Sequence, residues 1–166
     1  MYPLVTLEDA KKVASVLLKD SRLCGVEVFG SVARHGKGHD LDLILLVQNR
    51  ALATDFILQT NKAIDTEIAA SDILSRLEDS IPSSPHSAYD FNLREKVAIT
   101  LFGKDFEDLL DQAHRVIAHT KDDPYWNFDI FVLSRWWRDE IQVLAKGFPQ
   151  GDPNFWSNAK REAIRL

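Results

Sequence analysis

Two acidic residues at alternate positions open the most apolar segment of the chain. Asp40 and Asp42 lie at the start of a predicted strand, residues 41–47. Alternate residues of a strand project from one face, so the two carboxylates would lie side by side. Such a pair repels itself and is costly to desolvate unless a cation lies between the two groups. Magnesium prefers oxygen ligands, and two such ions can align the attacking and leaving oxygens of a phosphoryl transfer.

A Gly-Ser turn and a basic loop precede these acids. Residues 23–29 predict a short strand that ends at Gly30, where a backbone without a β-carbon can approach a ligand closely. Ser31 follows, and a glycine-rich stretch containing Arg34 leads to Asp40. The glycine spacing and the strand that comes next exclude a Walker-type phosphate loop.

In this order the segment resembles the DNA polymerase beta-type nucleotidyltransferase superfamily, especially its small minimal domains. Gly30-Ser31, Ala33-Arg34 and Asp40-Leu41-Asp42-Leu43 match the family pattern position by position. The resemblance implies that Gly30 and Ser31 hold the nucleotide's phosphates and that Asp40 and Asp42 bind two Mg²⁺ ions. Arg34 is either a further triphosphate ligand or a solvated loop cation.

The resemblance extends from the first helix to Gly103, with two departures. The loop between Ser31 and Asp40 is shorter than in many minimal members, and His35 stands where the family often has glycine.

The resemblance also implies a third carboxylate on the next strand of the sheet. It would serve as a metal ligand or as the base that deprotonates an acceptor hydroxyl. Residues 63–70 alternate between apolar and polar side chains and predict that strand, which makes Asp65 and Glu67 the catalytic candidates. An apolar residue before Asp is the commoner form in relatives, so Asp65 is the preferred metal ligand, and Glu67 stays open.

The remaining pattern predicts helices around a small mixed β-sheet, a fold of the α/β (α+β) class. A nucleotidyltransferase domain, residues 1–104, would be followed by a helical region, residues 105–166, packed on it. Helices are expected at residues 7–19, 51–61, 72–79, 106–119 and 124–146, with a last short helix after Pro153 and a fourth strand at 97–102.

Composition narrows the class of protein. The chain has 166 residues, 45% of them hydrophobic and 27% charged, which is typical of a soluble globular protein. No apolar run is long enough to span a membrane, and no secretory signal is present, so we expect a cytoplasmic protein. The net charge of −5 argues against a nucleic-acid partner.

The expected activity is transfer of a nucleoside monophosphate, AMP from ATP or another NTP, to a hydroxyl on a small molecule or protein. The apolar excess on the predicted helix 124–146 indicates either a wall over a substrate cleft or a subunit interface. A homodimer, or an antitoxin that binds a helical HEPN-type toxin, is therefore an alternative. A non-catalytic nucleotide-binding domain is the third.

Overall fold

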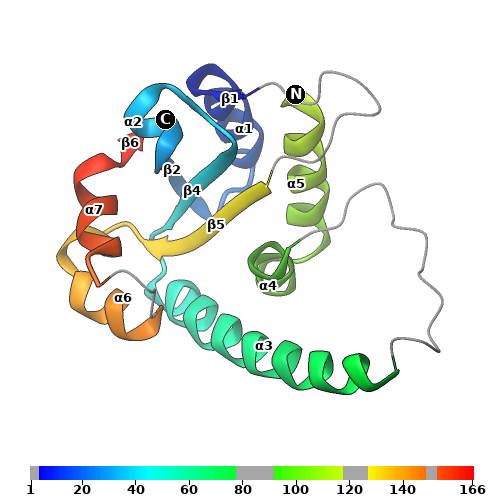
Figure 1. Ribbon diagram of the computed structural model, residues 1–166. Helices are drawn as coiled ribbons and strands as arrows, with labels where there is room; N and C mark the ends of the chain where they lie inside the picture. The colour runs from blue at the N-terminus through cyan, green and yellow to red at the C-terminus, as the bar shows by residue number, and fades with distance from the viewer. Residues whose placement is uncertain (1–3, 78–91, 118–126, 149–152) are drawn as a thin grey trace.

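A four-stranded sheet of mixed orientation forms the centre of the molecule (Figure 1). The computed structural model describes residues 4–77, 92–117, 127–148 and 153–166. Strands β4 and β5 are parallel, whereas β2 is antiparallel to both β4 and β6. The predicted mixed α+β class is confirmed. The order across the sheet is β5 (Asn127–Ser134), β4 (Asp40–Val47), β2 (Leu23–Phe29) and β6 (Ile164–Arg165).

Helices cover both faces of this sheet (Figure 1). Phe128 and Phe131 project from opposite faces of β5: Phe128 stacks on His114 of α5, and Phe131 packs edge-on against Trp156 of α7. Within the described residues, no helix is both long and apolar enough to cross a membrane. The helices are α1 (Leu7–Leu17), α2 (Ser31–His35), α3 (Arg50–Leu77), α4 (Leu93–Phe102), α5 (Lys104–Ile117), α6 (Ile141–Gly147) and α7 (Phe155–Glu162), with a short 3-10 helix, η2 (Trp137–Asp139).

The N-terminal segment braces the loop that precedes the two aspartates. Thr6 begins α1 with a capping box, in which its hydroxyl accepts from the Asp9 amide and the Asp9 carboxylate accepts from the Thr6 amide. Just before it, β1 (Val5–Thr6) pairs with β3 (Lys37–Gly38), so the predicted loop is folded into α2 and β3. This pairing fixes the chain two residues before Asp40.

The predicted strand at 63–70 is wrong, because these residues continue α3. No glycine or proline interrupts the sequence between residues 50 and 77, and alanine and glutamate favour a helix. The apolar alternation over 63–70 is too short to separate a strand from part of a long helix. The helix predicted separately at 72–79 belongs to the same α3 as far as Leu77; residues 78 and 79 lie outside the described residues.

The predicted helix at 124–146 is wrong in its first half, where residues 127–134 form strand β5, whereas its last residues are helical as predicted and belong to α6. Residues 128–134 are buried except for Asp129, as expected for a strand covered on both faces. Because nearly every residue of this run is apolar, apolar residues also occur at the spacings of three and four that are typical of a helix. The apolar side chains of β5 are core and do not form the exposed helical face that suggested a subunit interface, although Val143 of α6 is 59% exposed. The homodimer and the toxin partner stay predictions without that support.

The predicted strand at 97–102 is helix α4. Asn92 and Glu95 form a capping box, in which the side chain of each accepts a hydrogen bond from the backbone amide of the other. An Asn followed three residues later by Glu is a helix-start signal that can be read from the sequence. Both β5 and β6 come from the region predicted to be helical, residues 105–166, so the central sheet contains strands from both sides of the predicted boundary.

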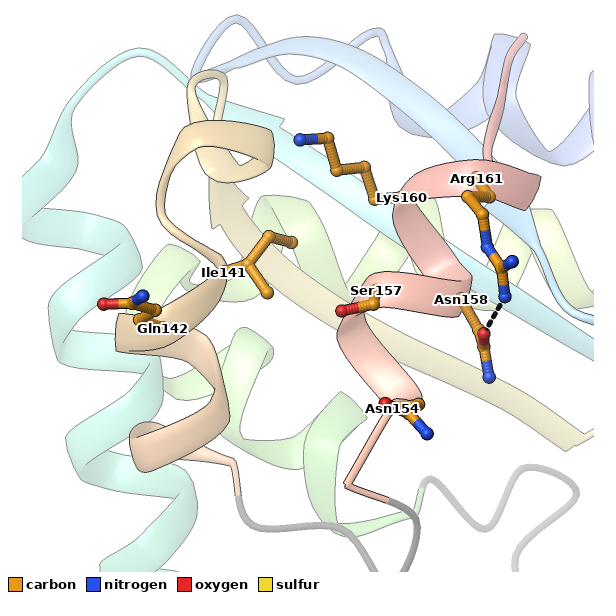
Figure 2. A pocket seen from close by; sticks show the side chains of 7 residues that line it. All are labelled: Ile141, Gln142, Asn154, Ser157, Asn158, Lys160 and Arg161. Carbon is orange, nitrogen blue, oxygen red and sulfur yellow. Dashed lines mark hydrogen bonds between the residues drawn. The ribbon is translucent and has the colours of Figure 1, made fainter.

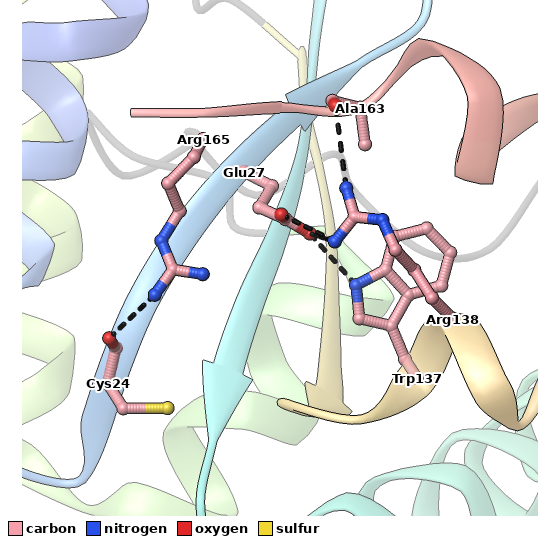
Figure 3. A network of polar contacts seen from close by, with 6 residues as sticks. All are labelled: Cys24, Glu27, Trp137, Arg138, Ala163 and Arg165. Atoms are coloured by element: carbon pink, nitrogen blue, oxygen red, sulfur yellow. Dashed lines mark hydrogen bonds and ion pairs between the residues drawn. The ribbon is translucent and has the colours of Figure 1, made fainter.

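Buried polar contacts attach this C-terminal region to β2 (Figure 3). Glu27 is 2% exposed. Its carboxylate accepts a hydrogen bond from Trp137 Nε1 at 2.8 Å and forms an ion pair with Arg138 at 2.8 Å. Arg138 also donates to the Ala163 carbonyl, and Arg165 donates to the Cys24 carbonyl. These contacts fix the last residues of the chain beside the turn at Gly30.

Candidate functional site

The turn after β2 brings the Gly-Ser pair against the second aspartate. Gly30 has φ +76°, in the left-handed region that favours glycine. A β-carbon at Gly30 would overlap the Asp42 carboxylate, so the missing side chain makes room for that carboxylate. In the same way the Ser31 hydroxyl fills the space beside Gly38. Gly30, Ser31 and Asp42 thus meet as the sequence predicted.

Strand register places a third aspartate beside Asp42. In the parallel pair of β4 and β5, Asp42 lies opposite Asp129. Residues opposite each other in a sheet project from the same face, so both carboxylates lie on the face that α7 covers. Asp40 is on this face too, at the exposed start of β4. We call Asp40, Asp42 and Asp129 the acidic cluster.

The electrostatics of Asp42 follow from this arrangement. The pKa of Asp42 is raised to about 7: burial is the largest cause, the negative charges of Asp129, Asp40 and Glu162 act in the same direction, and Arg34 opposes them. Among the described residues, none makes a hydrogen bond or ion pair to its carboxylate. A half-buried carboxylate beside like charges, with its pKa raised, occurs at functional sites more often than in ordinary cores.

Sequence reasoning missed Asp129, because its strand was read as a helix. Its carboxylate pairs with Arg94 of α4 at 2.5 Å, and the Arg94 guanidinium also lies over the Phe131 ring, 4.5 Å from its centroid. The signal that could have identified it is the pair Phe128-Asp129, an apolar residue followed by Asp, which is the form that favoured Asp65.

Asp65 and Glu67 do not join the cluster. Both lie in α3, which begins after the far end of β4 and places Asp65 about 22 Å along its axis from Arg50. Asp65 is exposed, and it is not among the charges that act on Asp42. The third carboxylate beside Asp42 is Asp129, so the expectation for residues 63–70 fails with their strand.

Helix α7 lies over Asp42 and forms one wall of a cavity of about 310 Å³. Gly30, Ser31, Arg34 and Asp42 line one side of it, and Phe155, Asn158 and Glu162 of α7 line the other. The Glu162 carboxylate accepts a hydrogen bond from the Gly30 amide at 3.1 Å and an ion pair from Arg34 at 2.9 Å. Arg34 therefore faces the cavity, and its guanidinium is already paired with the Glu162 carboxylate.

A second, more open hollow lies between α6 and α7 (Figure 2). Its polar lining includes Gln142, Ser157 and Asn158, with Lys160 and Arg161 along α7. Asn158 also lines the cavity beside Asp42, so the two hollows share a wall.

The acidic cluster offers the donor set that magnesium takes. Within the described residues, no three carboxylate, imidazole or thiol groups already enclose a metal-sized site. Magnesium rarely uses such a protein cage: it is bound through one or two carboxylates and completes its shell with water and substrate phosphates. Asp42 has its carboxylate free for a cation, and Asp40 is exposed beside it, so these residues fit the ion. Asp129 would first have to part from Arg94.

A scan against models of protein families, a search of curated proteins and a search of solved structures each find no match to this chain.

Proposed function

We propose that the protein is a nucleotidyltransferase of the DNA polymerase beta type, which transfers AMP from ATP, or the monophosphate of another NTP, to an acceptor hydroxyl. One observation carries the proposal: Asp42 and Asp129 lie in register on adjacent strands, on the face where the Gly30–Ser31 turn meets the sheet. This register supports the proposal in two ways. It joins the residues that match the family pattern, and it supplies the third carboxylate that the resemblance implies and that the sequence alone did not locate.

The residues then divide the work. Asp40 and Asp42 would hold magnesium, which when bound neutralises the triphosphate and orients its reacting phosphate. The Gly30 amide and Arg34 would bind phosphate oxygens, with the Ser31 hydroxyl beside them. Asp129 would accept the proton of the acceptor hydroxyl. In such a site, catalysis depends mainly on positioning and charge neutralisation, so an error of about 1 Å costs roughly a hundredfold in rate.

The hollow of Figure 2 is the place we propose for the acceptor. It adjoins the cavity at Asn158, and its amide and hydroxyl side chains can hydrogen-bond a polar molecule that carries hydroxyl groups. Two cations, Lys160 and Arg161, line it. These charges favour a neutral or anionic acceptor over the cationic one that the overall charge of −5 would suit.

A second candidate function, a non-catalytic nucleotide-binding domain, is favoured by the Arg94–Asp129 ion pair. A base neutralised by an arginine of its own chain cannot take a proton until that pair opens. Calorimetry with magnesium–ATP and an assay of turnover separate the two functions, because the second predicts binding without turnover.

The experiment that tests the proposal measures pyrophosphate released from ATP in the presence of magnesium and a panel of hydroxyl-bearing acceptors. Asp42→Asn and Asp129→Asn should each lower the rate at least about a hundredfold. Asp65→Asn is the matched control, because it removes the same charge from an exposed position of α3 and should leave the rate unchanged. Equal loss in the Asp65 and Asp129 variants, or turnover that survives both cluster substitutions, contradicts the proposal.

A further inference from the structure

The last residue of α7 places a carboxylate on donors that the proposed function assigns to phosphate. Glu162 accepts a hydrogen bond from the Gly30 amide through one carboxylate oxygen, at 3.1 Å, and from Arg34 Nη1 through the other, at 2.9 Å. A backbone N–H and a guanidinium are donors suited to any oxyanion. A triphosphate oxygen and the Glu162 carboxylate would therefore use the same two groups.

The carboxylate is also held close to like charge. Glu162 is one of the groups whose negative charge acts on Asp42, in a cavity that Asp42 also lines. In the described part of the chain, Arg34 is the cation that pairs with Glu162. A carboxylate in this position adds to the repulsion within the site and makes the cavity less receptive to a free anion.

The surroundings of α7 fix the backbone at Glu162. Trp156, 3% exposed, anchors the helix against Phe131, and β6, directly after the helix, pairs with β2. Arg138 also donates to the carbonyl of Ala163, the residue after Glu162 (Figure 3). With both ends of α7 fixed, the contact belongs to the packed fold.

We propose that Glu162 is an autoinhibitory latch, whose carboxylate occupies the Gly30 amide and Arg34 and must leave before the triphosphate of a nucleotide can bind there. The role of the latch in inhibition rests on the proposed function. The competition between the Glu162 carboxylate and a polyphosphate for the two donors does not depend on that function. Because the side chain stands at the end of its helix, rotation of Glu162 alone can release both donors.

Isothermal titration calorimetry of the full chain with two probes tests the latch. The first probe is inorganic tripolyphosphate without divalent cations, which tests only the donors; the second is magnesium–ATP. Glu162→Gln keeps the size of the side chain and removes its charge, and should bind both probes at least about tenfold more tightly than the unaltered protein, because a larger fraction of molecules has the donors open. Glu162→Ala provides a second variant should the first lose stability, which thermal unfolding will report.

Glu107→Gln is the matched control. It removes the same charge from an exposed partner of Lys104 on α5 and should change neither affinity. If Glu107→Gln also bound the probes more tightly, the gain in affinity would follow from the change in net charge, and the latch would be overturned.

The outcomes separate the two proposals. Tighter tripolyphosphate binding by the Glu162 variants, with ATP bound by no form of the protein, supports the latch and overturns the proposed function. ATP bound equally by all forms overturns the latch and leaves the function standing. Weaker binding in the Glu162 variants overturns the latch and makes Glu162 part of the ligand set. Failure of both probes in every form overturns both proposals.

Discussion

The carboxylate of Asp42 fills the space in which a β-carbon of Gly30 would stand. The contact joins the end of one strand to the side chain of its neighbour, since β2 ends at Phe29, the register partner of Asp42. Two separate features therefore require glycine at position 30: its positive φ and the space that the Asp42 carboxylate occupies in place of a β-carbon.

Gly30→Ala should lower both stability and activity. Gly30 has φ +76° and ψ −153°, a backbone region that is essentially restricted to glycine and costs about 1–3 kcal/mol for a residue with a β-carbon, and the new methyl group must also displace Asp42. Gly36→Ala is the control for a positive φ without the contact, because Gly36 has a φ of +78° with ψ −6°, in the ordinary left-handed region, and no atom lies within 4 Å of the added carbon. Urea unfolding should show a loss in both variants, whereas pyrophosphate release should fall about a hundredfold in Gly30→Ala alone. Equal activity in the two variants would contradict the role given to this contact.

Asp42 should make the protein less stable as the pH rises. Its folded-state pKa of about 7 lies above the ordinary value of 3.8, so the folded state favours the protonated form and loses stability between these two pH values. Asp42→Asn should then stabilise the protein at pH 8, by up to about 4 kcal/mol, with no gain below pH 4. Urea unfolding in the presence of EDTA, at several pH values, measures this difference. A variant no more stable than the parent at pH 8 would show that Asp42 is not held in a costly environment.

Asp129→Asn should move the titration of Asp42. Removing a neighbouring negative charge favours the ionised form, and the Arg94 side chain, released from its pair, acts in the same direction. The pKa of Asp42 should fall from about 7 toward 3.8 without reaching it, because burial is the largest cause of the shift and remains. Carboxyl ¹³C NMR titration measures it, with Asp139→Asn in the exposed turn before α6 as the control. An unchanged pKa in Asp129→Asn would mean that the two carboxylates do not face each other.

The parts of the site that sequence reasoning found are contiguous in the chain. Gly30, Ser31, Asp40 and Asp42 lie within one strand–turn–strand unit, where spacing alone fixes which residues meet. Local patterns are informative there, because β2 and β4 pair directly with each other. The structure brings Gly30, Ser31 and Asp42 together as that unit predicts.

The parts that it missed depend on contacts between distant residues. Asp129 reaches Asp42 through a parallel pairing, which needs a long connection and leaves no local signature in the sequence. Its strand is buried on both faces, so neither a period of two nor a period of 3.6 could identify it. Glu162 contacts Gly30 across 132 residues, a relationship that no spacing rule reports.

Glu27→Gln should destabilise the fold while leaving the acidic cluster intact. The buried Glu27 carboxylate neutralises Arg138 and accepts from the Trp137 indole, which attaches the C-terminal region to β2. The amide can keep the indole bond but leaves the half-buried Arg138 charge unpaired, a loss of about 1–3 kcal/mol. Glu140→Gln removes the same charge from the exposed pair with Arg50 and should cost less than about 1 kcal/mol. Urea unfolding followed by circular dichroism measures both, and equal losses would mean that the buried pair contributes no more to the attachment of the C-terminal region than a surface contact does.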